Sequence, residues 1–185
     1  GTSTYVRSGG NQTITAQGMF IEGRTSGAVG DGNSVWVESF GNQNVTLDSI
    51  GLTLASGGGA SATKDHAAML NQLGTAGTGQ TITLNNGGSI YMEGGASTLT
   101  NVGGNGHGSR ALIESDGDAQ TITLNGGGAI DLIGGTNGSR AYAQIYAKTG
   151  TQTVTGASTI SLNAGASGGF DGEGNTARIA ADVGT

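Results

Sequence analysis

The chain has 185 residues, of which 39 are glycine, and it contains neither proline nor cysteine. Glycine at this level without a three-residue period excludes collagen, and the lack of cysteine excludes a disulfide or thiolate-metal framework. The 7 basic and 13 acidic residues give a net charge of −6, which argues against a nucleic-acid partner, and no apolar run reaches the length of a membrane span.

In chain order, the first expected element is a short strand at Ser3–Ser8. A four-residue pattern follows, made of glutamine, any residue, isoleucine or valine, and threonine. We interpret it as the start of a strand that we call strand a. The pattern occurs five times, at intervals of 31, 37, 40 and 32 residues, in 12–15, 43–46, 80–83, 120–123 and 152–155.

Two further alternating runs follow each copy of the pattern. The first run, strand b, occupies 19–21, 52–54, 90–92, 130–132 and 160–162. Next come glycine-rich inserts at 23–33, 55–64, 94–108, 134–139 and 164–175. The last run, strand c, occupies 35–37, 67–70, 111–113, 141–147 and 177–183. The opening strand aligns with strand c, so the chain begins and ends on a strand of this type.

Alternation with period two marks strands that turn one side to the core and the other to solvent. Equivalent strands lie a full repeat apart rather than in hairpins, so like strands should stack on like in three parallel sheets. The sequence therefore predicts an all-β, single-stranded parallel β-helix, or β-solenoid, of about five three-strand coils of 31–40 residues. It forms one domain over 1–185, and its long glycine-rich inserts leave one edge.

The inward positions predict aliphatic rows along the column. We expect the glutamines that open strand a to lie at a corner and to form an amide ladder, each side chain bonded to the next. Strand a contributes Ile14, Val45, Ile82, Ile122 and Val154, then Ala16, Leu47, Leu84 and Leu124. Strand b contributes Met19, Leu52, Ile90, Ile130 and Ile160, then Ile21, Leu54, Met92, Leu132 and Leu162. Strand c contributes Val37, Ile113, Ile145 and Ile179.

Tandem units of the form QTITL…GGGAIDLIGG, as at 120–135, resemble the β-helix repeats of filamentous-haemagglutinin-type exoproteins and of autotransporter passenger domains. The likeness covers essentially the whole chain and rests on pattern and composition. No catalytic or binding motif of those proteins is matched, so no site residue is transferred. The resemblance implies a right-handed β-helix, export from a bacterium, and a role at the cell surface or in a filament.

Strand a also carries threonines at its outward positions, which predicts two threonine rows on a flat sheet. Threonine is favoured at exposed strand positions, so the rows can be explained by strand propensity alone, without a binding function. Ice binding and a packing face between protomers are the alternatives. The predicted threonine face consists of Thr13, Thr15, Thr81, Thr83, Thr121, Thr123, Thr153 and Thr155.

Six of the eight aromatic residues fall at outward positions of strands b and c or of the opening strand, which is of the c type. Tyr5 and Trp36 occupy equivalent sites on adjacent coils and should stack. An interface between subunits is the favoured reading, and a sugar-binding platform or cover by the inserts are alternatives. The predicted outer aromatic patch consists of Tyr5, Trp36, Phe20, Tyr91, Tyr142 and Tyr146.

Enzyme activity and bound cofactors are not expected. A β-helix hydrolase or lyase needs acidic and basic groups clustered on neighbouring coils, and the chain offers two lysines, Lys64 and Lys148, among scattered acids. Acidic stretches at 30–34, 115–119 and 170–176 carry oxygen atoms suited to Ca²⁺, but they lack the spacing of calcium β-rolls. We interpret them as turns, without a metal site.

The ends of the chain carry the functional prediction. Neither end shows a helix, a charged edge or a proline that would cap a solenoid, and bare parallel edges are templates for another copy. The first hypothesis is therefore an extracellular bacterial protomer that stacks head to tail into a filament. A glycan-binding adhesin fragment, using its inserts or aromatic rings, and an ice-binding protein are the alternatives. The predicted polymer interface consists of Tyr5, Val6, Arg7, Arg178, Ile179, Asp182 and Val183.

Overall fold

The computed structural model describes residues 3–23, 34–57, 67–74, 76–95, 109–135, 141–165 and 175–182. Most of each predicted insert lies outside these ranges. All regular secondary structure within them is β, in the strands β1 (Ser3–Ser8), β2 (Gln12–Gly23), β3 (Ser34–Ser39), β4 (Gln43–Ser56), β5 (Ala67–Gln72), β6 (Gly79–Leu84), β7 (Ile90–Glu93), β8 (Arg110–Ser115), β9 (Ala119–Leu124), β10 (Ala129–Ile133), β11 (Ala143–Ala147), β12 (Thr151–Thr155), β13 (Thr159–Asn163) and β14 (Ala177–Ala181).

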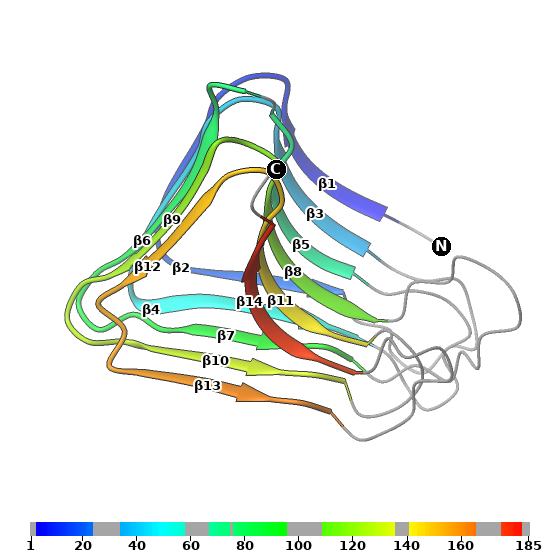
Figure 1. Ribbon diagram of the computed structural model, residues 1–185, viewed down its shortest axis with the longest axis vertical. Coiled ribbons are helices and arrows are strands. Elements are labelled where there is room, and N and C mark those ends of the chain that lie inside the picture. The colour runs from blue at the N-terminus through cyan, green and yellow to red at the C-terminus, as the bar shows by residue number, and fades with distance from the viewer. Residues whose placement is uncertain are drawn as a thin grey trace, which may run out of the picture.

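The strands stack into a triangular column with three faces (Figure 1). The c face is a six-stranded parallel sheet in the order β1-β3-β5-β8-β11-β14. The a and b strands share one hydrogen-bonded sheet, in the order β12-β9-β6-β4-β7-β10-β13, with β2 beside β4. β2 and β4 each run through both the a and the b position as one continuous strand, which joins the a and b strands in one sheet. The column therefore has three faces but two hydrogen-bonded sheets, where the sequence predicted three.

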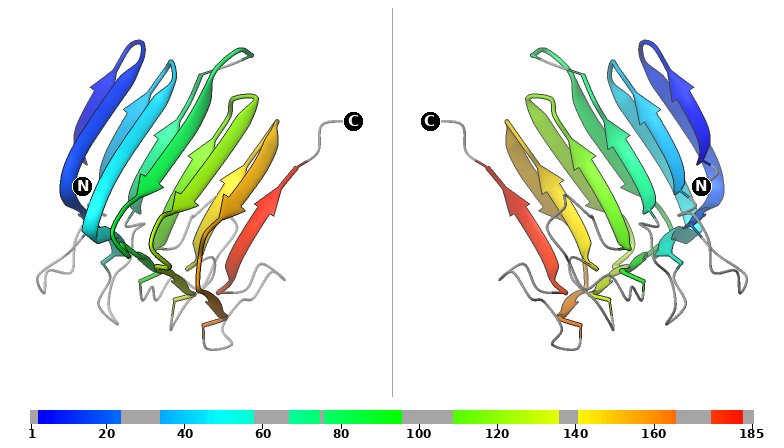
Figure 2. Two further views of the ribbon diagram at one scale, coloured as in Figure 1. Left: turned by 90° about the vertical axis from the view of Figure 1, so that its left-hand side faces the viewer. Right: turned by 90° about the vertical axis from the view of Figure 1, so that its right-hand side faces the viewer.

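The chain winds as a right-handed solenoid, as the resemblance implied. From β1 it passes over the upper corner of Figure 1, down the a face and along the b face, counterclockwise, while it advances toward the viewer. Figure 2 shows this advance from the side, from blue to red. The solenoid has about four turns, close to the five coils predicted, since five copies of a strand are separated by four turns. The predicted fold class is confirmed.

The predicted amide ladder runs through the column in register. Successive glutamines donate from Nε2 to Oε1 of the side chain one coil earlier, over 2.8, 2.7, 2.8 and 2.6 Å, along the series Gln12, Gln43, Gln80, Gln120 and Gln152. Gln80 also donates to the Leu70 carbonyl oxygen at 3.1 Å. The three central glutamines are at most 1% exposed, so the ladder lies inside the column and satisfies amides that water does not reach.

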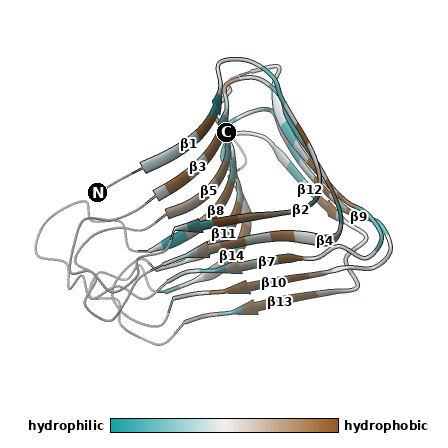
Figure 3. Cartoon of the chain, turned by 180° about the vertical axis from the view of Figure 1, so that it is seen from behind, coloured by the Kyte–Doolittle hydropathy of each residue, from teal (hydrophilic) through white to brown (hydrophobic). Residues whose placement is uncertain are grey.

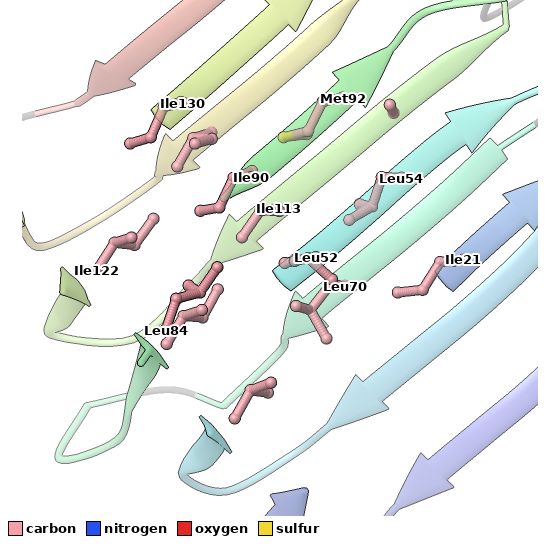
Figure 4. Packing of buried hydrophobic residues seen from close by; sticks show 14 of the residues in the cluster. Ile21, Leu52, Leu54, Leu70, Leu84, Ile90, Met92, Ile113, Ile122 and Ile130 are labelled. Carbon is pink, nitrogen blue, oxygen red and sulfur yellow. The ribbon is translucent and has the colours of Figure 1, made fainter. Parts of the chain in front are cut away.

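The predicted inward rows form the core of the middle coils, as the side chains of Figure 4 show. Figure 3 shows apolar segments, in brown, on all three faces. The rows lose their cover at the ends of the column, where Ala16 is exposed and Ile160 and Leu162 are 53% and 47% exposed. A row excludes water only where a coil lies on both sides of it, so the end coils are the weakly packed ones.

Glycine is required where the turns between the a and b faces stack on one another. A Cβ atom at Gly128 would overlap the carbonyl oxygen of Gly88, and one at Gly88 would overlap the carbonyl oxygen of Asp48. The backbones of three successive coils therefore touch at this corner, which explains the repeated glycine runs that follow strand a.

Candidate functional site

The threonine face is the a face of the column, turned toward the viewer in the left panel of Figure 2. Cross-strand register places its outward residues in two rows that run along the column. One row is Thr15, Thr46, Thr83, Thr123 and Thr155, and the other is Thr13, Asn44, Thr81, Thr121 and Thr153. All of these residues are exposed or half-buried, so the structure brings the predicted threonines together on one surface.

The predicted outer aromatic patch is divided between two faces. Tyr5 and Trp36 lie on the c face and stack as expected, with ring centroids 6.0 Å apart. Phe20 and Tyr91 lie in β2 and β7, on the b face, and Phe20 is 64% exposed. The six aromatic residues therefore do not form one binding surface.

The outer side of the c sheet carries a second apolar cluster. Met69 and Leu112 are only 4% and 3% exposed although their side chains point outward, and they pack with Ala67. Trp36, Tyr142 and Tyr146 border this cluster. Leu112 occupies an outward position of strand c, and its burial cannot be predicted from the sequence, because alternation shows the direction of a side chain and not what covers it.

The N-terminal half of the predicted polymer interface is β1, which is exposed over nearly its full length. Its inward residue, Val6, is 55% exposed and Tyr5 is 50% exposed. Arg7 connects the strand to the next coil, because its Nη2 atom lies 2.6 Å from Glu38 Oε2. Within β1, its guanidinium group also lies 4.9 Å from the centre of the Tyr5 ring. β1 is thus attached through its parallel pairing with β3, the Arg7–Glu38 ion pair and the Tyr5–Trp36 stack, while its side chains remain largely exposed.

The C-terminal half of that interface lies at the opposite edge of the c face. Arg178 and Ile179 are in β14, Asp182 follows this strand, and Val183 lies outside the described residues. The Arg178 guanidinium group lies 5.5 Å from the centre of the Tyr146 ring, and the Tyr146 hydroxyl donates to the Asp182 carboxylate. The two halves of the predicted interface are therefore the first and last strands of one sheet.

An open groove of about 720 Å³ follows the corner between the a and b faces. Within it, Asn86 donates to Asp48 at 2.6 Å and Asn125 donates to Asn85 at 3.0 Å. Side-chain amides and a carboxylate suit a polyhydroxylated ligand such as a glycan better than an apolar one. Sequence reasoning had sought glycans at the inserts and the aromatic rings, and it missed this corner.

Charged side chains also gather on the c face, where the sequence had suggested only a turn. Glu114 is the last residue but one of β8, Asp116 directly follows this strand, and Lys148 Nζ lies 3.2 Å from Asp116 Oδ2. Burial raises the pKa of Glu114 to about 7, with a further contribution from the hydrogen bond and charge of Asp116. The cluster was missed because Lys148 is 32 residues from Asp116 along the chain and reaches it only through coil stacking.

Among the described residues, no three or more His, Cys, Asp or Glu side chains are grouped for metal binding, and no helix is long and apolar enough to cross a membrane. The chain matches no protein-family model, and searches of curated proteins and of solved structures also find no match. The functional argument therefore depends on the solenoid and its surfaces.

Proposed function

We propose that the protein is a structural β-solenoid protomer that stacks head to tail into an extracellular filament. The observation that carries this proposal is the exposure of core residues at the C-terminal end of the column. Ile160 and Leu162 are 53% and 47% exposed, whereas Ile130 and Leu132, in register one coil earlier, are completely buried. A further coil laid on β13 would bury this pair as β13 buries the pair in β10.

The N-terminal end offers a surface of matching pattern. Through the stacked strands, Met19 belongs to the same inward row as Ile160, and Ile21 to the same row as Leu162. A second copy moved along the axis would place its β2 on β12 and β13 of the first copy and continue each row. Such a contact joins two different surfaces and does not close on itself, so it generates a filament.

The c face sets the geometry of this junction. The c face has six strands, whereas the a and b faces have five strand positions each. If the coils stack across the junction without a gap, β14 of one copy and β1 of the next would occupy the same position on the c face. Only one of these two strands can therefore remain there. We infer that β14 keeps its position in the c sheet and that β1 of the next copy leaves it, because β1 is exposed over nearly its full length. The axial repeat of the filament is then five coils, about 24 Å at the usual strand spacing.

Substitutions at the two ends test this proposal. Leu162→Lys should block the C-terminal end and Met19→Lys the N-terminal end, because each places a charge where a coil must stack. Each variant alone should sediment as a monomer, and an equal mixture should form a dimer that grows no further. Ser161→Lys, an outward change on the same strand, should leave assembly intact. Assembly of Leu162→Lys at the wild-type concentration dependence would contradict the proposal.

The repeat pattern supports the location that we propose for the filament. Its likeness to filamentous-haemagglutinin-type and autotransporter-passenger repeats favours export from a bacterium, and a solenoid with a sparsely charged surface is suited to repetitive surface structure. Protease treatment of intact cells tests this location, since it should remove the protein without lysis.

The threonine face favours a second candidate function, ice binding. Threonine is concentrated there, although every face of the column offers outward strand positions. The equivalent row of the b face is Phe20, Thr53, Tyr91, Asp131 and Ser161. Strand propensity alone would place threonine on all faces, so its use on one face points to a property of that surface.

The spacing of the threonine face also suits ordered water. Neighbouring coils are about 4.8 Å apart and alternate residues of a strand about 6.7 Å apart, close to repeat distances of the hexagonal ice lattice. The two threonine rows contain no charged residue that would hold disordered hydration.

Thr83→Tyr should abolish thermal hysteresis, because a tyrosine ring would project from the centre of the flat face. Thr53→Tyr, on the b face of a neighbouring coil, is the matched control and should leave the hysteresis unchanged. Absence of thermal hysteresis in the wild-type protein, or equal loss in both variants, would eliminate this candidate.

A further inference from the structure

Two buried side-chain oxygens near the ends of β5 and β8 on the c face lack a hydrogen-bond donor. Asn71 lies directly opposite Glu114 in the strand register, and Asp116 comes two residues after Glu114. Asn71 is 2% exposed, and both Asn71 Oδ1 and Asp116 Oδ1 are buried without a hydrogen-bond partner. Native structures rarely leave such acceptors unpaired, and an ion is one of the few groups that satisfies several of them at once.

The basic side chains near this place leave the two unpaired oxygens without a donor. Lys148 reaches only Oδ2 of Asp116 and its side chain is 51% exposed, while Nε of Arg110 is itself buried without a partner.

We propose that the c face binds a calcium ion through side-chain oxygens of Asn71, Glu114 and Asp116. Two carboxylates and an amide oxygen are hard ligands of the kind that Ca²⁺ takes, and water can fill its remaining positions. Ca²⁺ is favoured over Mg²⁺, because Mg²⁺ requires nearly ideal octahedral geometry, whereas the positions of Asn71 and Glu114 are fixed by two strands and Asp116 follows the second of them. The ion would connect neighbouring coils of the c face, an activity separate from end-to-end stacking.

Thermal unfolding with CaCl₂ and with EDTA tests the site. A ligand that binds only the folded state raises the unfolding midpoint, so Ca²⁺ in large excess over its dissociation constant should raise the wild-type midpoint by several degrees. Glu114→Gln should remove this rise. Asp118→Asn is the matched control and should keep the rise, because Asp118 is an exposed carboxylate of the same turn that accepts a hydrogen bond from the Gly77 amide at 2.7 Å.

A second variant distinguishes Ca²⁺ binding from a stability change that arises only because Glu114→Gln removes the repulsion between the Glu114 and Asp116 carboxylates. Asn71→Asp adds a third carboxylate, so it should lower the midpoint in EDTA and tighten Ca²⁺ binding at least tenfold in calorimetry. The proposal is overturned if Ca²⁺ produces no rise beyond that of NaCl at equal ionic strength. It is also overturned if Glu114→Gln keeps the rise, if Asp118→Asn loses it, or if Asn71→Asp fails to bind more tightly.

Discussion

Replacing Gln80 with leucine should lower the free energy of unfolding by about 3–5 kcal/mol. Gln80 is 1% exposed and makes three hydrogen bonds: it donates to Gln43 and to the Leu70 carbonyl oxygen, and it accepts from Gln120. Leucine makes none of them and leaves buried polar groups of the coils on both sides unpaired. Urea unfolding followed by circular dichroism measures the loss.

The last glutamine of the ladder provides the control. Gln152 is half-buried, and its replacement by leucine leaves Gln120 Oε1 and the Ile145 carbonyl oxygen without donors near the open end. Water can replace part of what is lost there, so we expect a cost of about 1 kcal/mol. Equal costs at Gln80 and Gln152 would show that the ladder does not stabilise the interior of the column.

The second large effect is expected from truncating the core at different heights of the column. Leu84→Ala should cost about 2–5 kcal/mol, because Leu84 is completely buried between coils and its removal leaves a cavity. Leu162→Ala removes the same atoms from a side chain that is 47% exposed, and in dilute monomer it should cost less than about 1 kcal/mol. Similar losses at the two positions would contradict the open end on which the proposed stacking depends.

Strand type, register and core could be predicted because one signal repeats. The glutamine that opens each strand a marks the same position in every coil, so like residues could be aligned despite intervals that vary from 31 to 40 residues. Alternation then gave the inward direction of residues such as Ile82 and Leu84. The ladder followed, because identical amides one strand spacing apart have few other partners.

The features that could not be predicted from the sequence depend on contacts between residues of different coils rather than on the alternation within one strand. The burial of Met69 and Leu112 comes from cover on the outer side of the c sheet, which alternation does not report. The pair of Glu114 and Asp116, with Asn71 opposite, forms because β5 and β8 stack in one particular register. The merging of the a and b strands in β4 also could not be foreseen, because it depends on pairing with β2 across a corner where the register shifts between Ala16 and Gly18.

Electron microscopy of the wild-type protein over a range of concentrations tests the central claim most directly. Head-to-tail stacking predicts unbranched filaments as wide as one triangular column, with an axial repeat of five coils, about 24 Å, and unbroken strand spacing of about 4.8 Å across each junction. Monodisperse single particles at every concentration, or filaments whose repeat is not a whole number of coils, would contradict it.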